Sequence, residues 1–477
     1  MSAAPLHFQS AATIAASIRS GEIKARDALE HFLTRVDQLN APINAIVVQD
    51  REGARKRADA ADRARLAGAP LGPLHGVPMS IKESYQFEGM PTTWGIPEMK
   101  SNASVTTALT VKRLAAAGAN VFAKTNVPIR LADFQSYNEV YGTTNNPWDK
   151  ARTPGGSSGG SAAALAAGLT GLEIGSDIGG SIRNPAHFCG VFGHKPTWNL
   201  CPMRGHALDA NLAPSDISVI GPMARSAYDL EIALEIMAGP DDIDAPGLAI
   251  DLPALREPMS RLRIAVWADA GPFCPSSASV GACVQKVAEA LSRAGAHVDD
   301  KARPDFDPQK SHETFSALLL ATMASRLPDL DYNRLVERAQ DPNALQARWQ
   351  TMRMRDWVRY NEARVQLRWA WRRFFDGFDF MITPVMPVTA FPHDHRPEGQ
   401  RTIDVDGASV PYFNQTFWAG LAGVALLPAT VFPAGPANDG LPVGLQIIGA
   451  AYGDRRTIQL AQRMESMGFR FAPPPGY

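Results

Sequence analysis

The chain has 477 residues, of which 45% are hydrophobic and 20% charged, so it can bury a sizeable globular core. Its 47 Lys and Arg residues nearly balance 48 Asp and Glu residues, and a net charge of −1 gives no field that would attract nucleic acid or an anionic membrane. No apolar stretch reaches the roughly 20 residues that span a bilayer, and four cysteines without a C-x-x-C pair predict neither a disulfide scaffold nor a zinc site. Because the N-terminus also lacks a signal-peptide pattern, we expect a soluble cytoplasmic protein.

The N-terminal part of the chain alternates between helical and strand-like patterns. Apolar positions at helical spacing predict one or two amphipathic helices between Ala11 and Gln38, and a charged, alanine-rich helix follows. The apolar run Val77–Ile81 predicts a buried strand that delivers Lys82 at its end. A helix is expected at Thr106–Ala117 and a strand at Val121–Ala123. This alternation indicates α/β layering with a partly parallel sheet.

The C-terminal part is predicted to add strands, helices and one long helical region. An Asp- and Pro-rich stretch at 240–258 is typical of a surface connection. We expect strands at Leu262–Val266, Val424–Phe432 and Val443–Ile448, and helices at Gly281–Ala294 and Asp454–Met467. The stretch 309–375 is mostly helical in pattern. We therefore expect one compact domain over residues 1–477, with a helical covering subregion at roughly 310–375.

Four tryptophans in that helical region have two interpretations. They either pack in the core at helical spacing, as buried aromatic residues commonly do, or line an apolar pocket for an acyl or aryl group. The residues are Trp349, Trp357, Trp369 and Trp371.

Two segments rich in glycine and serine carry the chemistry. The first is Pro154–Ser161, with the sequence PGGSSGGS, and the second is Gly175–Pro185, with the sequence GSDIGGSIRNP. Glycines beside a serine allow sharp turns whose peptide N–H groups converge on a developing oxyanion. Each segment alone also fits a flexible loop, and the first matches the G-x-S-x-G elbow, which would make Ser157 the nucleophile rather than Ser181.

Together and in this order, the two segments resemble the signature of the amidase signature family. Further motifs of that family are matched along nearly the whole chain, roughly from residue 10 to 468. They are GVPMSIK at 76–82, KTN at 124–126, GVFGHKPT at 190–197 and GLPVGLQ at 440–446.

The resemblance implies a Ser–Ser–Lys triad. Lys82 matches the family's catalytic lysine, Ser157 the bridging serine that follows a cis peptide bond in relatives, and Ser181 the nucleophile. The backbone N–H groups of Ile178, Gly179, Gly180 and Ser181 would form the oxyanion hole. Asp177 and Arg183 would support the loop without being catalytic.

The same resemblance implies the fold, the partners and the reaction. The fold would be a single α/β/α domain around a large twisted mixed sheet. The substrate would be a small-molecule amide, with no metal, nucleotide or redox cofactor, no nucleic-acid or membrane partner, and a homodimer as an unsurprising assembly. A lysine normally titrates near 10.4, so Lys82 can act as a base near neutral pH only if burial lowers its pKa.

Several positions leave the substrate open. Glu83-Ser84 stand where relatives commonly carry Asp-Asn, and Ile129-Arg130 replace an acidic residue found in many of them. These positions, and the stretch Phe134–Tyr137, are expected near the active-site wall. Two alternatives remain: the glutaminase component of a tRNA-dependent amidotransferase, and an esterase or carbamate hydrolase with the same triad. A Ser-His-Asp hydrolase is disfavoured because His187, His393 and His395 lie in no recognisable triad context.

Overall fold

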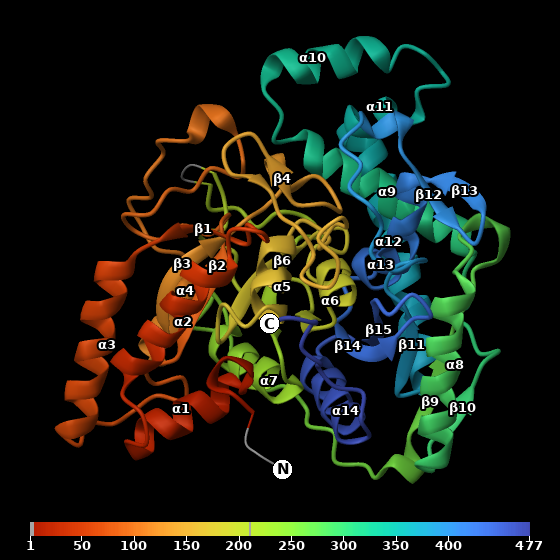
Figure 1. Ribbon diagram of the computed structural model, residues 1–477. Helices are drawn as coiled ribbons and strands as arrows, with labels where there is room; N and C mark the ends of the chain where they lie inside the picture. The colour runs from red at the N-terminus through yellow and green to blue at the C-terminus, as the bar shows by residue number, and fades with distance from the viewer. Residues whose placement is uncertain (1–3, 209–210) are drawn as a thin grey trace.

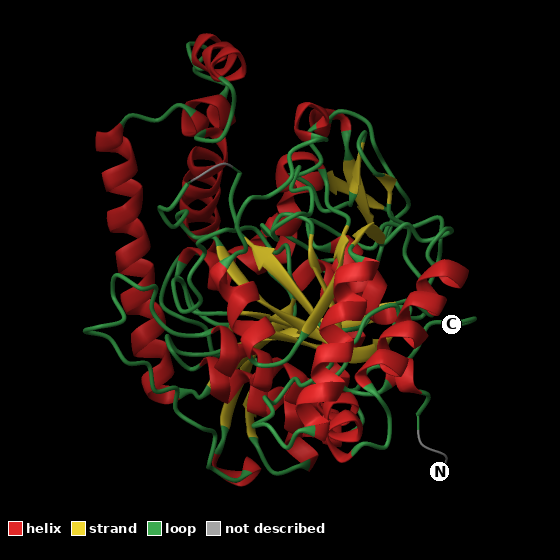
Figure 2. Cartoon of the chain, turned by 90° about the vertical axis from the view of Figure 1, so that its left-hand side faces the viewer, coloured by secondary structure: helices red, strands yellow, loops and turns green. Residues whose placement is uncertain are grey.

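A computed structural model describes residues 4–208 and 211–477, and it has a large sheet with helices on both faces (Figures 1 and 2). Residues 1–3 and 209–210 of the expected 1–477 domain lie outside the described residues. The eight strands of the sheet follow the order β10-β9-β11-β15-β14-β7-β8-β6. Strand β9 pairs in parallel with β10 and β11, whereas the other pairs are antiparallel. The predicted α/β architecture around a large mixed sheet is therefore confirmed.

The strands of the large sheet lie in the second and last thirds of the chain. They are β6 (Glu173–Asp177), β7 (Phe192–Lys195), β8 (Val219–Ala224), β9 (Arg263–Val266), β10 (His297–Asp299), β11 (Phe380–Pro384), β14 (Ala429–Pro436) and β15 (Pro442–Ile448). The helices that pack against the faces and ends of this sheet include α5 (Gly159–Ala166), α6 (Arg183–Cys189), α7 (Ala227–Met237), α8 (Ala278–Arg293), α13 (Thr416–Val424) and α14 (Asp454–Ser466). Strand β6 lies at one edge of this sheet. The glycine- and serine-rich loop that follows β6 therefore borders the smaller sheet described next.

A smaller sheet adjoins that edge. Its strand order is β1 (Ile46–Gln49), β3 (Asn120–Thr125) and β2 (Pro78–Lys82), with β2 and β3 parallel. The Ser80 N–H donates to the Leu172 carbonyl at 3.3 Å, just before β6 begins, so β2 lies beside β6. This junction brings the end of β2, with Lys82, next to the end of β6. The N-terminal helices α1 (Ala11–Ser20), α2 (Ala25–Leu39), α3 (Arg51–Leu66) and α4 (Leu109–Ala116) pack around it (Figure 1).

The helical region predicted at 309–375 forms four helices near the large sheet. They are α9 (Pro308–Ala324), α10 (Asp329–Arg338), α11 (Leu345–Gln350) and α12 (Met354–Gly377). Helix α10 stands away from the body of the molecule and has no buried residue (Figure 1). Two short ribbons, β4 (Tyr137–Asn138) with β5 (Gly142–Thr143) and β12 (Thr402–Val405) with β13 (Ala408–Pro411), complete the strands of the described residues.

Most predicted elements are confirmed, but several boundaries are wrong. Helix α8 begins at Ala278 rather than Gly281. Helix α4 begins at Leu109 rather than Thr106. The strand predicted from Val424 begins only at Ala429, because Val424 ends the buried helix α13 and Leu426 turns the chain with a φ of 61°. A continuous apolar run looks the same in a buried helix and a buried strand, so periodicity could not separate them. Within the described residues, no helix combines the length and apolar composition that crossing a bilayer requires.

Candidate active site

The amine of Lys82 lies at the junction of the two sheets. Every residue of β2 is buried, and the Lys82 Nζ lies 2.7 Å from the Ser157 Oγ and 2.9 Å from the Ser176 Oγ. Burial lowers the pKa of Lys82 to about 7, although the nearby Asp177 and Glu173 carboxyl groups act in the opposite direction. An amine with this pKa is partly neutral at physiological pH, which is the form that can accept a proton.

Ser157 is held in a turn where the neighbouring backbone leaves no room for side chains. The peptide bond between Gly156 and Ser157 is cis. A Cβ on Gly156 would lie 2.3 Å from the Asp133 carbonyl oxygen, so only glycine fits there. The Ser136 hydroxyl donates to the Gly155 carbonyl at 3.0 Å and accepts from the Gly159 N–H at 3.1 Å. Ser136 thus fixes the turn from both sides, a role that no sequence motif indicated.

Ser181 follows strand β6 in a loop tied together by a buried ion pair. The Asp177 carboxylate pairs with the Arg183 guanidinium at 2.9 Å, and both side chains are fully buried. Although burial raises the pKa of Asp177, the charge and hydrogen bonds of Arg183 outweigh it and lower that pKa to about 2. Arg183 also donates to the Ala419 carbonyl and the Gln446 side chain, at 2.8 and 3.0 Å. The loop is therefore anchored to α13 and β15.

The peptide N–H groups of this loop divide into two sets. The Gly180 N–H donates to Asp177 Oδ1 at 2.8 Å, so in this structure it holds the loop. The N–H groups of Ile178, Gly179 and Ser181 have no hydrogen-bond acceptor among the residues that the structure describes. Free donors that flank a serine hydroxyl are the arrangement that stabilises an oxyanion formed at an attacked carbonyl.

The three predicted triad residues meet at one place. The Ser158 N–H donates to the Ser181 carbonyl at 3.1 Å, which links the two glycine- and serine-rich segments, and Ser157 and Ser181 line the same cavity. Their hydroxyls form no hydrogen bond with each other in the described part of the chain. Such contacts are often long without substrate and tighten when it binds.

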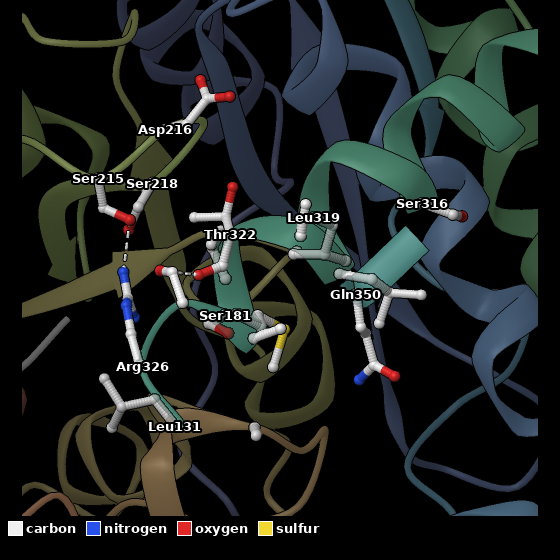
Figure 3. Close-up of a pocket in the computed structure, with 18 of the residues that line it drawn as sticks. Leu131, Ser181, Ser215, Asp216, Ser218, Ser316, Leu319, Thr322, Arg326 and Gln350 are labelled. Atoms are coloured by element: carbon white, nitrogen blue, oxygen red, sulfur yellow. Dashed lines mark hydrogen bonds between the residues drawn. The ribbon is translucent and has the colours of Figure 1, made fainter. Parts of the chain in front are cut away.

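The cavity has a volume of about 1070 Å³ and reaches from the two serines to helices α9 and α11 (Figure 3). One wall holds Ser157, Ser176 and Ser181, and the opposite wall carries apolar and polar side chains of the helical region. The apolar part of the lining includes Leu131, Phe134, Leu319, Met323, Trp349 and Trp357. This composition suits a substrate with an apolar or aromatic body.

The four tryptophans divide between the two interpretations. Trp349 and Trp357 line the cavity, whereas Trp371 is fully buried in the core and Trp369 is 58% exposed. The Trp349 indole N–H donates to the Tyr360 hydroxyl at 2.9 Å, which orients its ring. Helical spacing alone could not assign these roles because it does not show which face meets the cavity.

Of the positions expected near the active-site wall, some line the cavity and others do not. Arg130 lines the cavity. Glu83 is buried behind it and accepts the backbone N–H groups of Thr93 and Trp94 at 2.5 and 2.9 Å, which places the Trp94 side chain in the cavity wall. Within Phe134–Tyr137, only Phe134 lines this cavity.

The histidines singled out by the sequence lie away from the cavity. His187 is buried, and its ring nitrogens lie 2.9 Å from the Gly444 carbonyl and 3.0 Å from the Val388 carbonyl. The ring of His395 stacks on Tyr137, and neither His393 nor His395 lines the cavity that contains Ser181. Sequence reasoning missed His206, which lines the cavity with its Nε2 2.9 Å from the Ser84 hydroxyl. It also missed the contact of Ser176 with Lys82.

Comparisons with known proteins agree with this site. The family model described as Amidase matches residues 27–458. The chain is 32% identical to one of the subunits of the glutamyl-tRNA(Gln) amidotransferase of Prochlorococcus marinus (strain MIT 9303), over 94% of this chain and 95% of that protein. It is also 32% identical to an acylamidase of Rhodococcus erythropolis, over 97% and 96% of the two chains.

Among solved structures, one described as a vestigial protein complex that reveals the origins of an s-triazine catabolic enzyme is similar throughout. Its chain has 29% identity and a TM-score of 0.83, and the match covers 97% of this chain and all of the other. The fold and the serine-lined cavity, with the buried Lys82 in contact with Ser157, define an amide hydrolase. The chain belongs to the amidase family, whose members carry the amidase signature.

Proposed function

We propose that the protein hydrolyses a small carboxylic amide with an aryl or otherwise apolar body, through an acyl-enzyme on Ser181. The observation that carries the proposal is the contact between Lys82 and Ser157, 2.7 Å apart and buried beside the cavity that Ser181 lines. A lysine whose pKa falls to about 7 can serve as the base that a serine nucleophile needs.

The proposed reaction moves one proton through two hydroxyl groups. Neutral Lys82 accepts the Ser157 proton while Ser157 accepts the Ser181 proton, and the Ser181 Oγ attacks the amide carbonyl. When the tetrahedral intermediate collapses, the C–N bond breaks and the departing amine takes the proton back along the same path. Water, deprotonated in the same way, then attacks the acyl-enzyme ester. The ester C–O bond breaks, the Ser181 Oγ takes the proton back along the same path, and the released carboxylic acid ionises to the carboxylate in water. No group outside the chain, the substrate and water is needed to balance these steps.

We further propose that backbone donors stabilise the oxyanion. The N–H groups of Ile178, Gly179 and Ser181 support this role because they have no acceptor among the described residues. The Gly180 N–H, which the sequence also suggests for it, is engaged with Asp177 and would contribute only by sharing its proton between the carboxylate and the oxyanion.

A panel of amides with matched bodies tests the function. We expect aryl and long-chain amides to be cleaved with higher kcat/KM than acetamide, because the cavity is large and its lining mainly apolar. Product amine is measured for each substrate, with the Ser181→Ala protein as the control for contaminating hydrolase. A clear preference for acetamide would contradict the apolar substrate class, and cleavage that persists in Ser181→Ala would contradict the mechanism.

One comparison favours a second candidate, the glutaminase role in a tRNA-dependent amidotransferase, since a relative from a glutamyl-tRNA(Gln) amidotransferase is 32% identical. This role would require further subunits. Robust amide hydrolysis by the purified chain alone, with glutamine a poor substrate, supports the independent amidase. Glutamine hydrolysis that appears only in the presence of a copurifying protein would support the alternative.

A further inference from the structure

Positive and negative charges nearly cancel over the whole chain, but the charged side chains that line the cavity are not all paired. Five acidic or basic side chains line it: Arg130, Asp133, Asp216, Glu313 and Arg326. Asp133 is neutralised by Arg401 at 2.7 Å, with both side chains almost fully buried. Asp216 is neutralised by Arg364 at 2.6 Å. Two of the three carboxylates are therefore already paired from outside the cavity, and the third belongs to an exposed residue.

The two arginines of the cavity have no such partner in the part of the chain that the structure describes. No carboxylate lies within ion-pair distance of Arg130 or Arg326 among residues 4–208 and 211–477. The Arg326 Nη2 donates to the Ser215 hydroxyl at 2.5 Å, and the guanidinium carbon lies 5.4 Å from the centre of the Trp94 ring. Neither a hydroxyl nor an aromatic face neutralises its charge. Arginine stays protonated in proteins, so a permanent cation is left in a partly desolvated wall.

The effect of burial on Arg326 agrees with this picture. Burial lowers the pKa of Arg326, and no acid among the described residues offsets that change. By contrast, the pKa of Arg401, which faces Asp133, is raised because the carboxylate outweighs the burial that would lower it. A partly buried cation without a counter-ion is destabilising unless a ligand supplies the opposite charge.

Arg130 and Arg326 belong to neighbouring parts of the wall. The Arg130 side chain donates to the Arg326 carbonyl at 3.4 Å, and its backbone N–H donates to the Trp94 carbonyl at 2.8 Å. Arg130 and Leu131 both have positive φ, at 53° and 60°, a backbone conformation that is uncommon for non-glycine residues. Figure 3 shows Arg326 and Ser181 on the lining of the same space.

We propose that the amide substrate also carries a carboxylate, and that Arg326, assisted by Arg130, binds it. The inference rests on the proposed amidase function and narrows its substrate class to amides that join an apolar or aryl body to a carboxylate. The guanidinium fork matches the two carboxylate oxygens, and in the described residues its hydrogen bonds use only the donor to Ser215. The apolar lining contacts the body of the substrate while Ser181 attacks its amide.

The test compares substrates that differ only in charge. Succinyl para-nitroanilide is paired with isocaproyl para-nitroanilide, in which an isopropyl group replaces the carboxylate. A second pair, para-acetamidobenzoate and para-isopropylacetanilide, places the same change on the amine side. In at least one pair, we expect kcat/KM of the carboxylate-bearing substrate to exceed that of its neutral match by about 10- to 100-fold. This is the effect expected of a hydrogen bond between charged groups.

The decisive readout is the ratio of the two kcat/KM values in Arg326→Gln. This ratio should fall by about 10- to 100-fold, and loss of folded protein cancels because both substrates meet the same preparation. Arg130→Gln should lower it less, and Arg368→Gln, an exposed arginine of α12, should keep the wild-type ratio. Equal kcat/KM values for the charged and neutral members of both pairs in the wild type would overturn the carboxylate site.

Binding to the Ser181→Ala protein separates this inference from the function on which it rests. In isothermal titration calorimetry, para-acetamidobenzoate and succinyl para-nitroanilide should each bind more tightly than the matched neutral compound. Arg326→Gln should abolish this difference in affinity. Wild-type turnover of the neutral amides with no binding preference would refute the carboxylate site alone. An Arg326-dependent preference without any amide turnover would refute the amidase function alone.

Discussion

The two walls of the cavity are built in different ways. The catalytic wall is closed to solvent, with Lys82 and Ser157 0% and 1% exposed and Ser181 6% exposed. Its loops are fixed by the buried Asp177–Arg183 pair. The opposite wall comes from helices α9 and α11, where cavity residues such as Thr322 and Trp349 are only half-buried.

This difference separates chemistry from substrate choice. A proton relay works only when donors and acceptors stay within hydrogen-bond reach, which requires the dense polar contacts of the catalytic wall. In the proposed function, the helical wall contacts the substrate through apolar area and charge, which tolerate changes of side chain better. We expect changes in the catalytic wall to abolish turnover, and changes in the helical wall to alter preference among substrates.

The largest effect should come from the nucleophile. Ser181→Ala is expected to lower kcat by at least about 10³-fold, because the covalent intermediate can no longer form. Rates are measured on the best amide of the panel, and circular dichroism checks that the fold is kept.

Ser157→Ala is the matched control for the competing interpretation of the G-x-S-x-G turn. If Ser157→Ala were inactive while Ser181→Ala kept the wild-type rate, Ser157 would be the nucleophile. Mass spectrometry of the trapped acyl-enzyme identifies the modified serine directly.

The next effect concerns the protonation of the base. Since burial lowers the pKa of Lys82 to about 7 and only the neutral amine accepts a proton, kcat/KM should be flat above that pH and fall about tenfold per pH unit below it. The pH dependence of kcat/KM, measured on a substrate that has no ionisable group in this range, tests the expected fall at acidic pH. Lys82→Met should be nearly inactive at every pH. Full wild-type activity at a pH well below 6 would show that a protonated lysine is not inhibitory, which contradicts the proposed base.

The smallest effect should come from the helical wall. Trp349→Ala removes part of the apolar lining, so the preference for an aryl amide over acetamide should fall by roughly tenfold while acetamide turnover changes little. Trp369→Ala is the control, because that exposed residue does not line the cavity. An unchanged preference in Trp349→Ala would place the aryl group elsewhere in the cavity.

The sequence predicted the catalytic wall far better than the helical one. Short motifs with fixed glycine and serine spacing nominated Lys82, Ser157 and Ser181. The structure places Lys82 in contact with Ser157, and Ser157 lines the same cavity as Ser181. Local patterns found most helices and several strands, but they failed near Val424, where a buried apolar run is helical. They also missed β6, whose last three residues begin the second glycine- and serine-rich segment and which carries no alternation.

Sequence by itself determined which side chains are proposed to react, because turn geometry and the residues that allow it are local properties of the chain. Only the tertiary structure decided which side chains line the cavity, since Arg130, Arg326 and Trp349 come from separate segments of the chain and meet only when it folds. It also decided whether the charges of these arginines are paired. Whether an arginine meets a carboxylate, as Arg401 meets Asp133, or faces the cavity without one depends on long-range contacts that no local pattern records.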